Sequence, residues 1–338
     1  MIKDAIAKLV DRIDLSRVEA GQVMQEIMKG EATMAQISAY LVAMRLKGET
    51  IDEITGSAEI MRQYAVKIAP KSNKLLDTCG TGGDRSHTFN ISTVSAIVAS
   101  GAGAVVAKHG NRAVSSMCGS ADLLKELGVN IEAKPGVMQR CLDEIGIAFL
   151  FAPLLHESMK YAAPVRREIG IRTIFNLLGP MTNPAGAKHH LLGVFNINLT
   201  EALAKVLAKL GSKHVLVVSG KDGLDEITTT GETIISELKN GKVKTYKIKP
   251  ADFGIKKAKP ADLKGRDAAF NAKLTLDILK GKKGPQRDIV ILNAGAAIYA
   301  ADIAKNIKQG IKLARESIDS ASAMNKLEGL KKLTNQIS

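Results

Sequence analysis

The hydrophobic pattern of the chain changes near Lys74, and this change constrains the fold more than any other feature. From there on, short apolar segments alternate with segments of helical spacing. This alternation predicts βαβ units, in which a mostly parallel central sheet is flanked by helices on both faces. The expected strands span 75–78, 104–107, 129–132, 148–151, 191–195 and 215–219, and the expected helices between them begin near residue 91 and span 121–127, 137–145 and 201–210.

The part of the chain before this change has helical spacing only. Two residue pairs have the spacing of a capping box and mark helix starts, namely Ser16 with Glu19 and Thr50 with Glu53. We therefore expect an α/β protein with a small all-helical N-terminal domain over residues 1–70. A larger α/β domain is expected over residues 71–338.

Three further segments complete this plan. Residues 154–184 are polar and helical and lie between two expected strands, so we expect them to join the N-terminal helices. A cleft between the two parts would then be the natural ligand site. Asn240-Gly241, flanked by extended stretches, predicts a hairpin turn, and residues 287–334 return to helical spacing.

Composition excludes several classes of protein. With 338 residues, of which 45% are hydrophobic and 24% charged, the chain is typical of a globular protein. Its three cysteines (Cys79, Cys118 and Cys141) form no C-x-x-C pair, so neither a disulfide framework nor a zinc site is expected. The amphipathic start has no signal-peptide pattern, and polar residues and glycines interrupt the most apolar run, residues 91–107. We therefore expect a cytoplasmic protein without a membrane partner.

The net charge of +14 comes largely from one segment. Residues 239–283 contain thirteen lysines and one arginine against four aspartates, a net charge of +10. A polyanionic ligand or nucleic acid would account for such an excess. Few aromatic residues lie among the lysines, however, which favours a solvated lysine-rich surface over a nucleic-acid interface.

The sharpest local motif is glycine-rich and directly follows the first expected strand. Residues 77–84 read DTCGTGGD, and residues 88–93, TFNIST, open the next helix. Glycines let backbone N–H groups approach an anion, and the helix start adds its positive end and hydroxyl donors. The pattern predicts a phosphate cradle, although a glycine-rich turn with a helix cap is the plainer alternative. Because a carboxylate repels phosphate, Asp84 should hold the loop in shape or meet the ligand through hydroxyls or a metal.

A second motif, KHGNRAVSS over residues 108–116, follows the expected strand 104–107. Ligands of α/β sheets bind at the carboxyl ends of the strands. Lys108 and Arg112 can neutralise phosphate there, and the two serines can donate hydrogen bonds. His109 is either a structural residue or a ligand contact.

Two adjacent arginines and two adjacent carboxylates form the remaining motifs. Arg166 and Arg167 point in different directions on a helix, so one can bind a carboxylate ligand while the other pairs with protein. Ion pairing of both at the surface is the alternative. Asp225 and Glu226 follow the expected strand 215–219 and suit Mg²⁺, which takes a few protein oxygens together with phosphate and water. A solvated loop is the alternative at that position.

Taken together, the segments GTGGD, TFNIST, KHGNRAVSS, VRREIGIRTIFNLLGP and GLDEIT resemble the motif series of the anthranilate phosphoribosyltransferase family in order and spacing. The resemblance covers essentially the whole chain. It implies transfer of the phosphoribosyl group of 5-phosphoribosyl 1-pyrophosphate (PRPP) to the anthranilate amine, giving N-(5-phosphoribosyl)anthranilate and pyrophosphate, in tryptophan biosynthesis. It also implies Mg²⁺ as cofactor, an α/β domain that binds the phosphoribosyl group, and a homodimer.

The resemblance also assigns site residues. Its PRPP contacts correspond to Gly80, Gly83, Asp84, Thr88, Asn90, Ser92, Thr93, Lys108, Ser116 and Ser120. Its anthranilate contacts correspond to Gly80, His109, Asn111, Arg166, Gly179 and Pro180, and its Mg²⁺ ligands to Ser92, Asp225 and Glu226. Lys108 and Asp84 are expected to act electrostatically. No general base is expected, because the anthranilate amine is uncharged at neutral pH.

Two positions depart from the family pattern, and two other functions remain as alternatives. Arg85 stands where the family often has a small residue, and His156-Glu157 replaces a frequent His-Pro. A pyrimidine nucleoside phosphorylase would share the architecture but use phosphate as its nucleophile. A nucleic-acid-binding relative without catalysis would use the lysine-rich segment.

Overall fold

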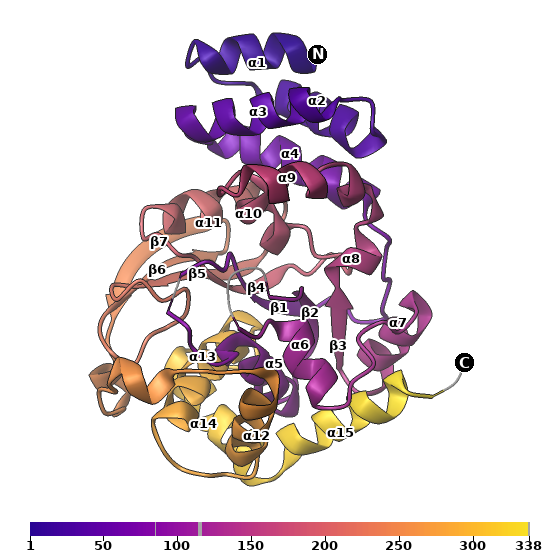
Figure 1. Cartoon of the computed structure of the whole chain (residues 1–338). Helices are drawn as coiled ribbons and strands as arrows, with labels where there is room; N and C mark the ends of the chain where they lie inside the picture. Colours follow the sequence, from indigo (N-terminus) through magenta and orange to yellow (C-terminus); the bar gives the residue numbers. More distant parts are fainter. Residues whose placement is uncertain (85, 114–116, 337–338) are drawn as a thin grey trace.

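The computed structural model describes residues 1–84, 86–113 and 117–336. Its N-terminal part is a stack of four helices at one end of the molecule (Figure 1). These are α1 (Ile2–Val10), α2 (Arg17–Lys29), α3 (Met34–Lys47) and α4 (Ile51–Tyr64). The expected capping boxes at Ser16 and Thr50 are confirmed, and Thr33 forms a third one with Gln36 at the start of α3.

Two glycines let α2 and α4 pack closely. A Cβ atom on Gly56 of α4 would overlap the carbonyl oxygen of Arg17 and lie 3.2 Å from the amide nitrogen of Gly21. Only a residue without a side chain fits at this crossing. The close approach of the two backbones therefore depends on Gly56.

A seven-stranded sheet forms the centre of the molecule, in the order β3-β2-β1-β4-β5-β6-β7. The first five strands along the chain are parallel, whereas β6 pairs antiparallel with β5 and β7 pairs antiparallel with β6. The predicted hairpin turn at Asn240-Gly241 is confirmed, with positive φ at both residues. The strands are β1 (Leu75–Gly80), β2 (Val105–Gly110), β3 (Ile147–Phe151), β4 (His189–Gly193), β5 (His214–Gly220), β6 (Thr233–Lys239) and β7 (Lys242–Ile248).

The connections place a topological switch point between β1 and β4. From β1 the chain moves to β2 and β3 on one side, and it then returns to β4 on the other side. The loops after β1 and β4 consequently leave the sheet in opposite directions. Such a point, at the carboxyl ends of the strands, is where open α/β sheets bind ligands.

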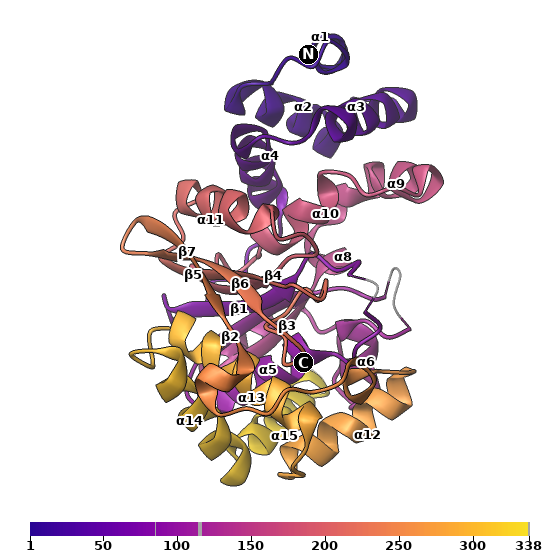
Figure 2. The same cartoon turned by 90° about the vertical axis from the view of Figure 1, so that its left-hand side faces the viewer.

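Helices cover both faces of the sheet, as Figure 2 shows. One face packs against α5 (Ile91–Gly101), α6 (Ser120–Glu126), α7 (Pro135–Glu144), α12 (Ala268–Leu279), α13 (Pro285–Ala300), α14 (Ile307–Asp319) and α15 (Ser322–Thr334). The other face packs against α9 (Ala163–Ile169), α10 (Phe175–Leu178) and α11 (Leu199–Lys209), and the same hydrophobic core continues into the N-terminal helices. Among the described residues, no helix combines the length and hydrophobicity needed to cross a membrane.

The predicted fold class is confirmed, whereas one predicted strand is wrong. Residues 129–132 show the alternating burial of a strand, with Val129 and Ile131 buried, but they form an irregular segment that ends in a turn at 131–132. The main-chain N–H of Asn130 donates to the hydroxyl of Thr334 on α15 at 3.2 Å. The alternation in this segment therefore reflects packing against the core and not pairing within the sheet.

Candidate active site

The glycine-rich loop leaves β1 at the switch point and lies between the end of β4 and the 223–228 turn. The amide of Thr81 donates to the carbonyl of Gly193 at 2.9 Å. The amide of Gly82 donates to Oδ2 of Asp225 at 2.9 Å. A Cβ atom on Gly80 would lie 2.7 Å from that same oxygen, so glycine is needed for the loop to approach the carboxylate.

Three carboxylates gather around this loop. Asp84 lies close enough to Asp225 to raise the pKa of its carboxyl, and both side chains act electrostatically on Glu226. Desolvation, with a contribution from Asp84, raises the pKa of Asp225 to about 7. Desolvation and the charge of Asp225 raise the pKa of Glu226 well above its ordinary value. The ionised forms of these carboxyl groups are thus disfavoured in the free protein, and a bound cation would favour them.

The turn that carries two of these carboxylates is fixed from α13. Asn293 accepts a hydrogen bond from the amide of Ile227 at 2.9 Å and donates to its carbonyl at 2.8 Å. Gly193 of β4 lies against the same turn, since a Cβ atom there would overlap the carbonyl oxygen of Asp225. The two carboxylates are thereby held at the end of β4.

The oxygen donors gathered here suit Mg²⁺ that is shared with a substrate better than a metal ion coordinated by protein side chains alone. Within the residues described by the structure, no three His, Cys, Asp or Glu side chains form a group that would hold a metal ion by themselves. Mg²⁺ commonly takes one or two carboxylates and completes its shell with substrate phosphates and water. Asp225 and Glu226, with the hydroxyl of Ser92 nearby, suit that mode of binding.

Lys108 reaches the cluster from β2. Its ammonium donates to the carbonyl of Thr78 at 2.5 Å and to the hydroxyl of Ser92, at the start of α5, at 3.4 Å. The side chain is only 4% exposed, and burial lowers its pKa while Asp77 and Glu226 oppose that shift. Next to Ser92, Thr93 is buried, and its hydroxyl has no partner among the described residues.

Thr88 and Asn90, which were predicted to contact PRPP, are held in place by residues from later parts of the chain. Thr88 forms an isolated bridge with Lys264. The side-chain amide of Asn90 donates to the carbonyl of Cys118 at 2.9 Å, and its oxygen accepts from Asn271 of α12 at 3.1 Å. These bonds hold the loop between the glycine-rich segment and α5 in place.

His109, the residue after Lys108 in β2, lies next to a second histidine, His156. Nδ1 of His109 is 3.1 Å from the carbonyl oxygen of Gly179. Because a carbonyl only accepts, Nδ1 carries the proton and Nε2 presents a lone pair. Burial lowers the pKa of His109 to about 3 and that of His156 to about 4. The two rings lie 5.1 Å apart, and the buried Nε2 atom of each has no partner among the described residues.

Arg166 is a partly buried cation that belongs to α9. Its guanidinium lies over the ring of Phe175 at 5.2 Å. Among the described residues, no carboxylate lies within ion-pair distance of it. Its neighbour Arg167 is exposed. Desolvation lowers the pKa of Arg166, so an anionic ligand would relieve the cost of burying this charge.

The remaining predicted residues lie at the ends of β1 and β2. Pro180 accepts a weak hydrogen bond from the thiol of Cys79 at 3.8 Å. The hydroxyl of Ser120 donates to the carbonyl of Asn111 at 3.1 Å. Arg112, expected to neutralise phosphate, instead approaches Asp122 at 3.6 Å and Glu132 at 3.5 Å. Ser116 and Arg85 lie outside the described residues.

Sequence reasoning missed two residues that shape the site. Arg172 donates to the carbonyl of Gly83 and stacks on the ring of Phe195 at 3.9 Å, so it supports the glycine-rich loop from outside. His156 stands out in the sequence only because Glu157, the residue after it, departs from the family pattern. Neither placement was predictable from local sequence, because each depends on how residues 154–184 pack against the ends of β2 and β4.

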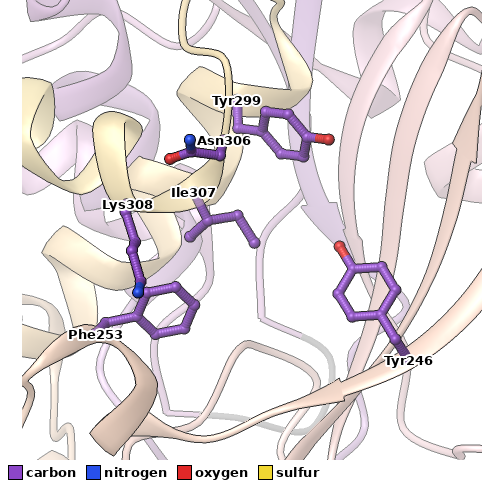
Figure 3. Close-up of a pocket in the computed structure, with 6 residues that line it drawn as sticks. All are labelled: Tyr246, Phe253, Tyr299, Asn306, Ile307 and Lys308. Atoms are coloured by element: carbon purple, nitrogen blue, oxygen red, sulfur yellow. The ribbon is translucent and has the colours of Figure 1, made fainter.

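A separate cavity of about 270 Å³ lies away from this chemistry. It is lined by residues of β7, of the 3-10 turn after β7, of the end of α13 and of the start of α14, which Figure 3 shows as sticks: Tyr246, Phe253, Tyr299, Asn306, Ile307 and Lys308. The ring of Tyr299 contacts His214, the first residue of β5. The cavity is therefore near the amino end of β5, opposite to the edge at which α/β sheets bind ligands.

Comparison with known proteins places the chain in a family. Residues 3–65 match the helical bundle domain of the glycosyl transferase family, and residues 72–324 match its a/b domain. The chain is 52% identical to the anthranilate phosphoribosyltransferase of Acetivibrio thermocellus over 335 residues, which cover 99% of this chain and 97% of the relative. The chain belongs to the anthranilate phosphoribosyltransferase family.

Solved structures of this family have the same fold. The anthranilate phosphoribosyltransferase of Thermus thermophilus is 43% identical and superposes with a TM-score of 0.94, covering 98% of this chain and 100% of its own. The enzyme of Saccharomyces cerevisiae in complex with PRPP and Mg is 27% identical, with a TM-score of 0.91 and coverage of 99% and 98%. The arrangement of a helical bundle and an α/β domain is thus common to these anthranilate phosphoribosyltransferases and this chain.

Proposed function

We propose that this chain transfers the 5-phosphoribosyl group of PRPP to the amine of anthranilate, giving N-(5-phosphoribosyl)anthranilate and pyrophosphate, in tryptophan biosynthesis. The names of its relatives support this activity. The observation that carries it is the gathering of glycine backbone, a buried lysine and three carboxylates at the switch point of the sheet. A sugar with several phosphates needs that combination of anion donors and a cation site.

On the donor side, backbone and hydroxyl groups surround the carboxylate cluster. The ammonium of Lys108 lies 3.4 Å from the hydroxyl of Ser92. This position supports an electrostatic role for Lys108 in binding the phosphates of PRPP. The side chain of Asp84 accepts a hydrogen bond from the amide of Ser86 at 3.2 Å, which supports a role in holding the loop. The residues proposed to contact PRPP are Gly80, Gly83, Asp84, Thr88, Asn90, Ser92, Thr93, Lys108, Ser116 and Ser120.

We further propose that Asp225, Glu226 and Ser92 hold Mg²⁺ together with the pyrophosphate oxygens. The yeast relative was solved with PRPP and Mg, which supports the same cofactor here. When bound, Mg²⁺ neutralises the charge that develops on the leaving pyrophosphate. The protein's part is to keep the two carboxylates aimed at that position through the contacts of Asn293 and Gly193 with their turn.

On the acceptor side, Arg166 binds the anthranilate carboxylate and His109 faces the amine. The free lone pair on Nε2 of His109 can accept a hydrogen bond from an N–H group. The amine attacks without prior deprotonation, so orientation is the main contribution of the protein and can supply up to about 7–11 kcal/mol. Gly80, Asn111, Gly179 and Pro180 complete the proposed anthranilate contacts.

We also propose the assembly and domain plan expected from the sequence. Residues 1–70 with the insertion at 154–184 form one domain, which is supported by the packing of α9 against α3. Large apolar residues exposed on the N-terminal helices and on the α1–α2 connection support a homodimer there; they are Val10, Ile13, Val18, Met34 and Leu46. A cytoplasmic location and small molecules as the only partners are consistent with the biosynthetic activity.

Anthranilate fluorescence tests the activity directly. Mixing anthranilate with the protein, PRPP and Mg²⁺ should abolish its fluorescence at a rate proportional to the protein concentration. Omission of PRPP or of Mg²⁺ should stop the decay. Stable fluorescence with all components present would refute the proposal, and release of thymine from thymidine and phosphate would favour the nucleoside phosphorylase instead.

A further inference from the structure

The pairing between β1 and β2 is shorter than that of their neighbours. The register of β1 with β2 covers Leu75↔Val105 and Leu76↔Val106. The pairs β1–β4 and β2–β3 each have five residues in register and continue to the carboxyl ends of the strands. The two strands that carry the donor-side motifs therefore lose their direct backbone pairing just before the proposed site.

A buried carboxylate and a buried amide fill the position at which the pairing ends. Asp77 of β1 is fully buried, and its Oδ1 accepts from the amide of His109 at 3.1 Å. Its Oδ2 accepts from Nδ2 of Asn183 at 2.8 Å. The same Nδ2 donates to the carbonyl of Ala107 at 2.8 Å, so one side-chain amide connects both strands.

This pair also connects the strands to the segment that contacts the histidine ring. Oδ1 of Asn183 accepts from the amide of Ala185 at 2.9 Å, which fixes the course of the chain after Pro180. The carbonyl of Gly179 in that segment holds the imidazole of His109. On the donor side, the neighbouring Lys108 bonds to the carbonyl of Thr78, the residue after Asp77.

We propose that Asp77 and Asn183 are positioning residues for the transfer reaction, a hydrogen-bonded wedge that holds the ends of β1 and β2 apart and sets the distance between the PRPP and anthranilate sides. This inference rests on the proposed function and assigns neither residue a contact with substrate. A buried pair of this kind is stable only while each polar atom keeps its partner, so a change at one residue displaces both strands.

Three variants of unchanged size test the wedge. Asp77→Asn places two amide donors against each other, and Asn183→Asp places two carboxylates against each other. Each should lower kcat by about 10- to 100-fold, since small displacements of reacting groups are costly. The double variant Asp77→Asn with Asn183→Asp restores a donor facing an acceptor between the two side chains. It lacks the bond to the carbonyl of Ala107, as Asn183→Asp also does, so its kcat should exceed that of Asn183→Asp by about tenfold.

The controls separate positioning from a loss of folding. The folded fraction at the assay temperature, measured by circular dichroism, corrects every kcat. Asn130→Ala removes an amide of the same type that donates to the carbonyl of Thr334 at 3.2 Å, far from the strand ends, and should leave kcat within about twofold. A double variant no faster than Asn183→Asp would overturn the proposal.

A crystal structure of Asn183→Ala supplies a readout that is independent of activity. The imidazole of His109 should leave the carbonyl of Gly179, and the ammonium of Lys108 should leave that of Thr78. Unchanged positions of both groups would overturn the wedge even if kcat fell. A wild-type protein that is inactive with PRPP and anthranilate would instead refute the proposed function, and the structural comparison would still decide on the wedge.

Discussion

In the described part of the chain, Arg166 has no ion-pair partner, and the carboxylate cluster has Lys108 as the cation acting on it. The guanidinium of Arg166 lies on Phe175 without an ion-pair partner among the described residues. Asp84, Asp225 and Glu226 crowd together near the single ammonium of Lys108. Unmatched charge at partly buried positions is unfavourable in the free protein, so it indicates where charged ligands are bound.

Arg166→Ala should therefore weaken anthranilate binding selectively. Loss of a hydrogen-bonded ion pair with the ligand carboxylate should lower kcat/KM for anthranilate by about 10- to 100-fold and change the KM for PRPP by less than about threefold. Steady-state kinetics with each substrate varied in turn measures both values. The exposed neighbour provides the control, because Arg167→Ala should change neither value; equal losses for both substrates in Arg166→Ala would remove this residue from the acceptor site.

The carboxylates should control the metal requirement. Asp225→Asn combined with Glu226→Gln removes the proposed negative ligands and should raise the Mg²⁺ concentration for half-maximal rate about tenfold or more. Rates measured across a Mg²⁺ series at saturating PRPP give this concentration. Glu232→Gln, a change to a carboxylate paired with Lys221 on the surface, should leave the series unchanged. An unaltered metal profile in the double variant would exclude the two residues from the metal site.

At the residue scale, side chains that lie within contiguous sequence motifs could be predicted. Side chains that come together only through the fold could not. The motifs pointed to Lys108, Asp225 and Glu226, and the structure gathers these side chains around the glycine-rich loop. Asp77 and Asn183 are 106 positions apart, and their hydrogen bond follows from the course of the chain between β3 and β4. No local pattern contains that information.

At the element scale, the close packing of α2 against α4 depends on a glycine. The crossing of α2 and α4 places Gly56 against the backbone of Arg17 and Gly21. The helical part rests on this crossing, because α2 and α4 both contribute to its hydrophobic core. A side chain at Gly56 would separate the two helices.

Gly56→Ala should destabilise the protein by about 1–3 kcal/mol, the usual cost of overpacking. Chemical denaturation followed by circular dichroism measures the change in the free energy of unfolding. Gly136→Ala in α7 is the matched control, since a Cβ atom there meets nothing within 4 Å. That change should be neutral or stabilising by up to about 1 kcal/mol. Equal stability of the two variants would show that the α2–α4 crossing is less tight than described.

Hydrophobic spacing predicted strands correctly where the buried residues also pair with a neighbouring strand. Alternation located β1, β2, β3, β4 and β5, and their parallel order follows from the helices between them. It failed at residues 129–132, where Val129 and Ile131 are buried against helices. Hydrophobic spacing indicates which side chains are buried. It does not show whether they pack in a sheet or against helices.

At the scale of the whole molecule, three of the buried imidazoles around the sheet have strongly lowered pKa values. Burial lowers the pKa of His109 to about 3, of His156 to about 4 and of His190 to about 3. The unfolded chain binds protons at these residues below a pH of about 6.5, while the folded protein does not. Each imidazole therefore reduces the free energy of unfolding as the pH falls from about 6.5 towards about 4.

His190→Gln should make stability less dependent on pH. Each buried imidazole should cost roughly 2 kcal/mol between pH 7 and pH 5, and the variant lacks one of the three. Asp225 and Glu226, whose pKa values are raised, act in the opposite direction in this range, so the difference between the two proteins is the quantity to compare. Urea unfolding at both pH values measures it. An identical pH dependence would mean that His190 is protonated in the folded protein.

The open edge of the sheet at β7 has a consequence for the lysine-rich segment. β7 is the last strand of the sheet, and Lys242, Lys244 and Lys247 are exposed along it. An unpaired strand invites another chain to add to the sheet, and a row of ammonium groups disfavours this through desolvation and repulsion. The positive charge at this edge therefore protects concentrated protein against growth of fibrils from β7.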